Sequence, residues 1–191
     1  MILMQNITIL IFILVFFSIS IYGFGKIFNN SFFQFNDLNT GEIGFLGYLF
    51  IYFIVLICNF FIAINIKLSF SLITLGFLFG IFEIIKFKKL KFKFIYLLIS
   101  FLLILISVTN NLHDDAYWYH LPYLNYIQSS KIIFGITNIN HFIYGQSFYD
   151  IMSFFKVPYY GNKFIYLLPN IFLIYFILYF IIFIKNYKKD K

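Results

Sequence analysis

The side chains best suited to acid–base chemistry gather in one stretch of the chain, residues 111–122. Two of the seven acids, Asp114 and Asp115, are adjacent there, together with two of the three histidines and the only tryptophan. A carboxylate beside a second carboxylate holds its proton more tightly, which suits a general base. Adjacent aspartates also cap helix amino termini and help to mark the end of a span. The residues alone leave both roles open.

The three histidines of the chain, His113, His120 and His141, lie in the same region. Isolated histidines at a membrane surface are more often ordinary polar residues than metal ligands. A zinc site would draw its ligands from His113, Asp115, His120 and His141. Their spacing matches no compact zinc motif, so we expect no zinc site there.

The elements that position these residues follow from a very apolar composition. Hydrophobic residues make up 62% of the 191 residues and charged residues only 11%, which a water-soluble domain cannot accommodate on its surface. We therefore predict an all-α, polytopic integral membrane protein in contact with a lipid bilayer. The single cysteine, Cys58, excludes an intrachain disulfide and any site built from several cysteines.

Apolar stretches close to the ~20 residues that cross a bilayer occur five times. The second and third come from one apolar run that is too long for a single crossing and is interrupted only at Asn65, Lys67 and Ser69, where we expect a tight turn. The first has no positive residue ahead of it and no cleavage pattern behind it, so we expect it to be retained. The predicted spans of this single membrane domain, 1–191, are 7–24, 44–65, 69–86, 94–108 and 163–184.

Two clusters of lysines set the predicted orientation. They follow the third and the fifth span: Lys86, Lys88, Lys89, Lys91 and Lys93, then Lys185, Lys188, Lys189 and Lys191. Short positively charged segments stay on the cytoplasmic side, so the loop 109–162 is predicted to be external, on a bacterial inner membrane. Parity then places the amino terminus outside. The loop 25–43 would be cytoplasmic, but its charges give no support, and if it dips into the membrane the amino terminus could change sides.

The external loop has the pattern of two short helices separated by a turn. Apolar residues recur at helical spacing over 117–128, which predicts an interfacial helix lying on the bilayer. Pro122 suits the first turn of that helix. A turn-rich stretch, 131–140, precedes a second short helix predicted over 148–155.

Few polar side chains lie inside the predicted spans. Glu83 precedes Lys86 by three residues near a helix end, where an ion pair would make the acid tolerable; a proton or substrate role is the less favoured alternative. Asn59 and Asn65 are expected to bond to neighbouring helices, and Pro169 lies near the start of the fifth span. This pattern argues against a proton pump, an ion-coupled transporter or a small channel.

An acidic pair just after an outward-going span, followed by a tyrosine-rich interfacial helix, resembles the first external loop of the GT-C superfamily of polytopic glycosyltransferases. The further pattern is similar to a group of large bacterial membrane proteins related to that superfamily. Its parts are Tyr119-His120-Leu121-Pro122, Gly135-Ile136-Thr137-Asn138, His141 and Ser147. The resemblance covers 114–155, about a fifth of the chain.

The resemblance implies transfer of a sugar from a polyprenyl-phosphate donor to an acceptor on the outer face of the membrane. One of Asp114 and Asp115 would be the base that deprotonates the acceptor hydroxyl, or would bind a divalent cation as in metal-dependent members. The lipid phosphate that leaves needs cationic or hydrogen-bonding partners, and the candidates are His120, Lys131 and His141. Arginine, the usual bidentate phosphate clamp, is absent from the chain.

The chain also departs from the superfamily pattern. Superfamily enzymes have more spans and carry the acidic loop after the first, whereas here the loop follows the fourth predicted span. We therefore expect one half of a split enzyme, a truncated frame or a remnant. The main alternative is a non-catalytic membrane subunit of a polysaccharide-assembly or transport complex, beside a second membrane subunit. The net charge of +7 is explained by the lysine clusters, so no nucleic-acid partner is expected.

Overall fold

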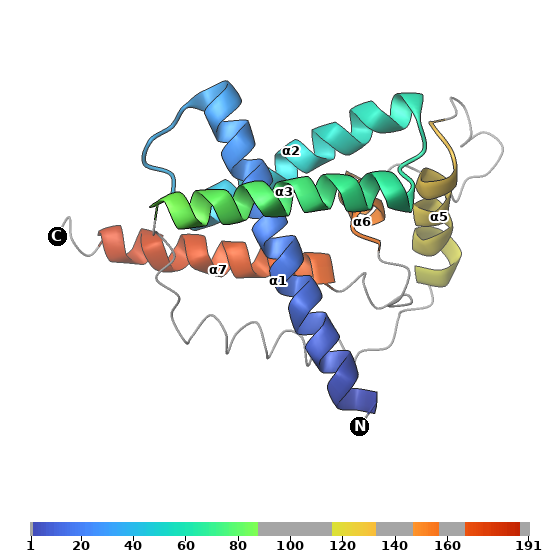
Figure 1. Ribbon diagram of the computed structural model, residues 1–191, viewed down its shortest axis with the longest axis horizontal. Helices are drawn as coiled ribbons and strands as arrows, with labels where there is room; N and C mark the ends of the chain where they lie inside the picture. The colour runs from blue at the N-terminus through green and yellow to red at the C-terminus, as the bar shows by residue number, and fades with distance from the viewer. Residues whose placement is uncertain (1, 88–115, 133–146, 157–166, 188–191) are drawn as a thin grey trace.

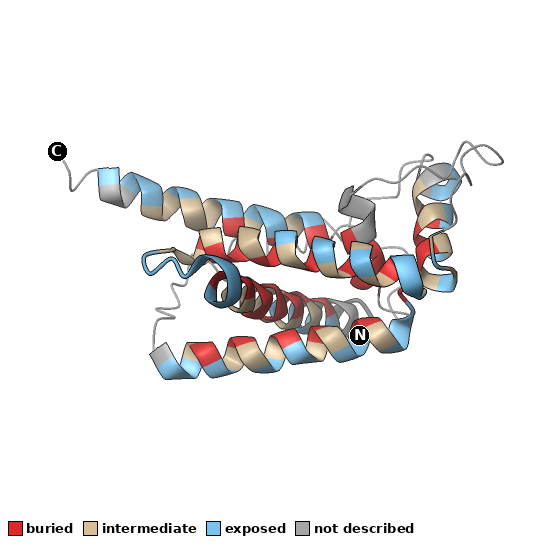
Figure 2. Cartoon of the chain, turned by 90° about the horizontal axis from the view of Figure 1, so that it is seen from above, coloured by how far each residue is buried: buried red, intermediate tan, exposed pale blue. Residues whose placement is uncertain are grey.

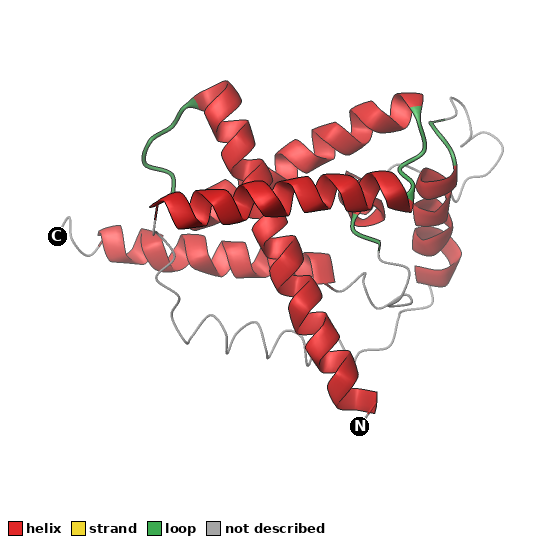
Figure 3. Cartoon of the chain, viewed as in Figure 1, coloured by secondary structure: helices red, strands yellow, loops and turns green. Residues whose placement is uncertain are grey.

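The computed structural model describes residues 2–87, 116–132, 147–156 and 167–187, and these are helices joined by short loops (Figure 1, Figure 3). No strand occurs among them. The elements, in chain order, are α1 Ile2–Phe28, the π-helical turn η1 Asn29–Phe33, α2 Thr40–Phe61, α3 Ile66–Phe87, the π-helical turn η2 Ala116–His120, α5 Leu121–Ser129, α6 Ser147–Phe154 and α7 Leu167–Tyr187.

Four of the described helices, α1, α2, α3 and α7, are long and apolar enough to cross a membrane. They correspond to the first, second, third and fifth predicted spans, and the all-α membrane fold is confirmed. The predicted fourth span, 94–108, lies outside the described residues. Pro169 is the third residue of α7. The backbone N–H groups of the first turn have no intrahelical acceptor, so a proline there costs the helix no hydrogen bond.

The turn between α2 and α3 lies earlier than the sequence pattern indicated. It comprises residues 62–65, so Lys67 and Ser69 belong to the first turns of α3 rather than to the break. The cause is Asn65, whose Oδ1 accepts a hydrogen bond from the Leu68 N–H at 3.0 Å and caps α3. Asn65 therefore serves its own helix, and the expectation that it bonds to a neighbouring one was wrong.

The start of α2 is also set by a cap, four residues before the predicted start of the second span. The Asn39 side chain accepts from the Glu42 N–H at 3.1 Å, and the Glu42 carboxylate accepts from the Asn39 N–H at 2.7 Å. This capping box satisfies two backbone donors that the first turn would otherwise leave unpaired. Glu42 is thus used at the helix end.

Glycines bring α1 against α3. A Cβ added at Gly23 would lie 2.0 Å from the Gly76 carbonyl oxygen, and one added at Gly80 would lie 2.4 Å from the Ile19 carbonyl oxygen. Backbones can approach this closely only where side chains are absent, as in the small-xxx-small contacts of membrane helices. Ser20 adds a buried hydrogen bond from its Oγ to the Ile73 carbonyl at 2.9 Å. Figure 1 shows α1 crossing α3 obliquely at this contact.

A second set of glycines lets α2 pack against α1 and α7. A Cβ added at Gly47 would lie 2.0 Å from the Ile21 carbonyl oxygen, so α1 and α2 touch backbone to backbone. A Cβ added at Gly44 would lie 2.1 Å from Cδ1 of Tyr175, so the ring of that α7 tyrosine occupies the space that a side chain would fill. The glycines of α2 therefore determine how closely α1 and α7 approach it.

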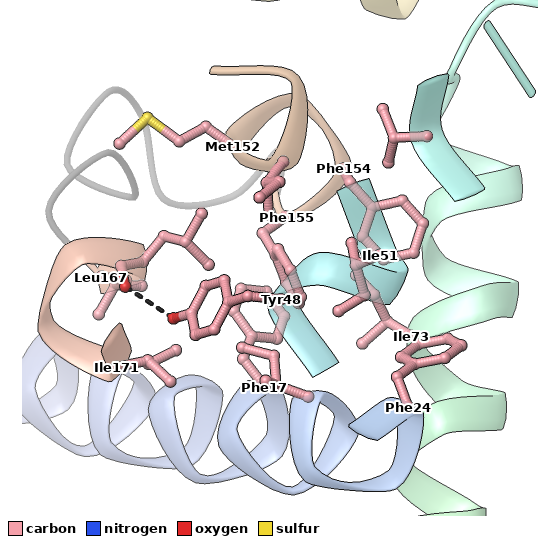
Figure 4. Packing of buried hydrophobic residues seen from close by; sticks show 14 of the residues in the cluster. Phe17, Phe24, Tyr48, Ile51, Ile73, Met152, Phe154, Phe155, Leu167 and Ile171 are labelled. Atoms are coloured by element: carbon pink, nitrogen blue, oxygen red, sulfur yellow. Dashed lines mark hydrogen bonds between the residues drawn. The ribbon is translucent and has the colours of Figure 1, made fainter. Parts of the chain in front are cut away.

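The core lies where α1, α2, α6 and α7 meet (Figure 4). The Phe17 ring of α1 lies 4.7 Å from the Phe155 ring that follows α6, and Ile51 of α2 is fully buried. The Tyr48 hydroxyl donates to the Leu168 carbonyl at 2.9 Å, which joins α2 to the first turn of α7. The short helix α6 is thus part of the core.

The outward faces of the long helices are apolar and exposed (Figure 2). Glu83 does not lie on such a face: it is only 4% exposed and its carboxyl lies within electrostatic range of the Tyr22 phenol on α1. Lys86 is exposed, with its Nζ 5.8 Å from the centroid of the Phe82 ring. The acid is therefore accommodated inside the bundle beside α1, and its expected ion pair with Lys86 stays a prediction.

Candidate functional site

The helix α5 lies at the end of the bundle formed by the α2–α3 turn, and it runs across the ends of those helices rather than along them (Figure 1). Its buried face consists of Leu121, Leu124 and Ile127. Pro122 occupies its first turn, as predicted, because the fixed proline φ angle fits a helix start. The short helix expected here is therefore present with its apolar face packed on the bundle, and its predicted position on the bilayer surface stays a prediction.

Backbone hydrogen bonds dock the carboxyl end of α5 onto the α2–α3 turn. The Ile64 N–H donates to the Ile127 carbonyl at 3.0 Å, and the Ile132 N–H donates to the Asn59 carbonyl at 2.9 Å. The two segments are more than sixty residues apart in the chain. Residues 127–132 of the predicted external loop are therefore fixed to the bundle.

Asn59 is the side chain that completes this attachment. It is 4% exposed, and its Nδ2 lies 3.1 Å from the Ser130 carbonyl and 3.4 Å from the Ile127 carbonyl. A third contact, also at 3.4 Å, is to the Ile62 carbonyl in the turn. The expectation that Asn59 bonds to a neighbouring helix is confirmed, and that helix is α5.

Two further side-chain bonds join α5 to α6. The Gln128 Nε2 donates to the Ser153 carbonyl at 3.0 Å, and the Lys156 Nζ donates to Oδ1 of Asn125. Because α6 also packs on α2, the two short helices and the bundle form one packed unit. The helix predicted over 148–155 is thus confirmed as α6, one residue earlier at each end.

Lys156 was not among the residues that the sequence singled out. Its side chain is half-buried, and desolvation by burial lowers its pKa below the ordinary lysine value of 10.5. The only sequence feature that could have drawn attention to Lys156 is its position directly after a short amphipathic helix in the predicted external loop. The structure adds it as a cation on the α5 side of the loop, next to Asn125.

The described residues include two of the predicted site residues. His120 is half-buried at the junction of η2 and α5, and Lys131 is exposed just beyond the other end of α5. A nine-residue helix separates them, about 14 Å at 1.5 Å per residue. Asp114, Asp115 and His141 lie outside the described residues. His120 is thus the described candidate nearest to the aspartates in the chain.

Large aromatic side chains surround this end of the molecule. Tyr117 and Trp118 in η2 are 55% and 72% exposed, and Phe60 and Phe61 at the end of α2 are 45% and 75% exposed. Aromatic residues of this kind are enriched where the hydrocarbon core meets the headgroups. The placement of η2 and α5 at headgroup level, which the sequence pattern indicates, stays a prediction.

Within the described ranges, no three side chains of His, Cys, Asp or Glu come together to hold a metal ion. The divalent cation that the resemblance allows would therefore depend on Asp114 and Asp115, outside those ranges. Comparison with known protein families, curated proteins and solved structures finds no match to the chain.

Proposed function

We propose that this chain is a membrane glycosyltransferase of the GT-C kind, which transfers a sugar from a polyprenyl-phosphate donor to an acceptor on the outer face of a bacterial plasma membrane. The observation that carries the proposal is the placement of η2 and α5. They lie across the end of the bundle, among exposed aromatic residues, and Asn59 anchors the carboxyl end of α5 to the spans. A loop held there meets a lipid-linked phosphate without leaving the membrane surface.

The proposed chemistry uses the acidic pair that directly precedes η2. One of Asp114 and Asp115 takes the proton from the acceptor hydroxyl, whose oxygen then attacks the anomeric carbon of the sugar. The bond from that carbon to the phosphate oxygen breaks, and the lipid phosphate leaves with the bonding electrons. The groups proposed to stabilise its charge are His120, Lys131 and His141.

The arrangement of the helix ends supports the proposed orientation. The α2–α3 turn and α5 share one end of the bundle, whereas α3 and α7 finish at the other end, α3 with Lys86 and α7 with Lys185 in its last turn (Figure 1). If positively charged ends stay inside, the end with α5 is outside. The hydrogen bonds of Asn59 are consistent with this orientation because they require the turn and α5 to be on the same side.

The test is sugar transfer by the purified chain in vesicles that contain labelled polyprenyl-phosphate sugars. Asp114→Asn and Asp115→Asn are compared at matched expression with Asp37→Asn, which alters an exposed acid in the α1–α2 loop. We expect one of the first two to lower the rate about 100-fold or more, the loss typical of a missing general base, and Asp37→Asn to have no effect. No transfer by the unmodified chain from any common donor would refute the proposal in favour of the non-catalytic subunit.

A further inference from the structure

The loop between α1 and α2 presents three phenylalanines to its surroundings. The side chains of Phe32, Phe33 and Phe35 are 67%, 43% and 56% exposed. Figure 2 shows the exposed surface of this loop beside the ends of the long helices. Three neighbouring large apolar side chains are rarely left in water without a purpose.

The loop holds this shape through a buried asparagine. Asn29 is 3% exposed; its Nδ2 donates to the Phe35 carbonyl at 2.9 Å and its Oδ1 accepts from the Phe35 N–H at 3.2 Å. Gln34 takes a left-handed conformation, φ 55°, and its N–H donates to the Asn29 carbonyl at 2.7 Å. A left-handed glutamine and a doubly bonded asparagine keep the aromatic rings outside rather than folded back.

The exposed rings continue the lipid-facing surface of α2. The Phe33 ring stacks on the Phe35 ring at 5.5 Å and lies 5.2 Å from the Phe28 ring at the end of α1. Phe28 in turn lies 6.4 Å from Phe53, which is 42% exposed on α2. One aromatic cluster, with Phe28 buried at its centre, therefore joins the exposed rings of the loop to an exposed ring of a membrane-spanning helix.

The charges of the segment also favour a bilayer over a protein partner. No charged side chain occurs between Lys26 and Asp37, so no charge opposes the entry of the phenylalanine rings into the interfacial region of a bilayer. Lys26, in the last turn of α1, has a stem long enough for its ammonium to reach the headgroups. A charge at each end and phenylalanines between them match the amphipathic pattern of an interfacial anchor.

We infer that this phenylalanine loop, residues 30–36, is embedded in the bilayer, in the leaflet at the end where α3 and α7 finish. The rings of Phe32, Phe33 and Phe35 lie among the upper acyl chains, and Asp37 remains in water. The loop 25–43 is then not a wholly water-exposed cytoplasmic loop, which accounts for its lack of net positive charge, Lys26 against Asp37 and Glu42. The inference does not depend on the proposed sugar transfer.

The test uses a fluorescent reporter at one loop position. In a Cys58→Ala background, Phe35→Cys is labelled with a nitrobenzoxadiazole dye and the protein is placed in phosphatidylcholine vesicles with or without a nitroxide at carbon 5 of the acyl chain. The matched control is Asp37→Cys, two residues further on. The Asn29 side chain bonds to the backbone of residue 35 and not to the phenylalanine ring, so we expect the loop to keep its shape in this variant.

We expect blue-shifted emission at position 35 and at least twofold stronger nitroxide quenching there than at position 37. Water-like emission at position 35 would overturn the inference. Blue-shifted emission without nitroxide quenching would overturn it too, because a second protein would then cover the rings. Phe32→Cys gives an independent measurement with the same expected result, should the first variant fail to fold.

Discussion

At the scale of single residues, Asn59 connects the membrane-spanning part of the chain to the loop that carries the candidate chemistry. One buried amide lies within hydrogen-bonding distance of three carbonyls, at Ile62, Ile127 and Ser130. In a membrane bundle an interhelical amide contributes only modestly to stability. Its importance here is geometric, because it sets where α5 ends and where Lys131 emerges.

We predict that Asn59→Leu loosens the carboxyl end of α5. The carbonyls of Ile127 and Ser130 lose their shared donor, at a cost of about 1–3 kcal/mol, and the local structure opens more often. Trypsin should then cut after Lys131 several-fold faster in detergent, as measured by mass spectrometry. Asn30→Leu, which alters an exposed asparagine of the α1–α2 loop, serves as control. Trypsin should cut this variant after Lys131 at the same rate as the unmodified chain. Equal rates for all three proteins would contradict the prediction.

Lys156 yields a prediction about pH. Burial lowers its pKa, so between the folded value and 10.5 the unfolded chain binds more protons than the folded one. The penalty of burying the charged amine is therefore largest below the folded pKa, and stability rises as pH increases through this window. Lys156→Met should flatten that rise, measured by thermal unfolding from neutral pH upward. Asn125→Leu keeps the amine and should keep the rise; an unchanged slope in the methionine variant would count against the prediction.

At the scale of elements, the glycine contacts explain why α1 crosses its neighbours obliquely. In lipid, helices gain little from apolar contact as such, so close backbone approach and hydrogen bonds decide which faces meet. Gly23 and Gly80 provide the close approach, and Ser20 adds its bond to Ile73. The opposite faces of α1 and α3 carry equally apolar side chains that remain exposed.

We predict that Gly80→Ala destabilises the protein although alanine is the better helix former. The new Cβ would lie 2.4 Å from the Ile19 carbonyl oxygen, which belongs to backbone and cannot swing away. Overpacking of this kind costs about 1–3 kcal/mol, seen as a lower Tm in detergent. The control is Ser71→Leu, which adds more bulk on the exposed face of the same helix and should leave Tm nearly unchanged. A Tm equal to that of the unmodified chain for Gly80→Ala would show that α1 and α3 do not meet there.

At the scale of the whole molecule, the elements divide between two ends. The α2–α3 turn and α5 lie at one end, and the α1–α2 loop and the last residues of α3 and α7 lie at the other (Figure 1). In the proposed topology the first end faces outward and bears the sugar-transfer loop. The second faces the cytoplasm and carries the phenylalanine loop in the lipid of that leaflet.

This division predicts the labelling pattern of single cysteines. In a Cys58→Ala background, Ser129→Cys at the end of α5 should react with a membrane-impermeant maleimide in intact cells. Tyr187→Cys at the end of α7 should react only after permeabilisation, because the neighbouring lysines hold that end inside. Reaction of both positions in intact cells, or the reverse pattern, would contradict the orientation. The side chains of residues 129 and 187 are both exposed, so the protein itself does not shield either position from the maleimide.

The candidate site could be anticipated only in part. The short helix α5, its Pro122 start and the helix α6 were predictable because amphipathic spacing and proline chemistry act over a few residues. The burial of Lys156 and the separation of His120 from Lys131 by the length of α5 were not anticipated. The burial arises from packing between segments distant in the chain. The roles of Asp114 and Asp115 stay predictions for the transfer assay.

The amino-acid sequence was sufficient to predict an all-helical membrane protein and the approximate positions of four long helices, because transfer of an apolar segment into lipid depends on local composition summed over ~20 residues. It did not determine which helix faces pack together, because in lipid an apolar helix face is about as stable against acyl chains as against another helix. Three contacts become visible in the three-dimensional packing: α1 crosses α3 at Gly23, Asn59 holds the end of α5, and the Glu83 carboxyl lies near the Tyr22 phenol. Each of these contacts joins residues that are far apart in the chain. A close backbone approach or a buried polar interaction there favours one packing of the helices over the others.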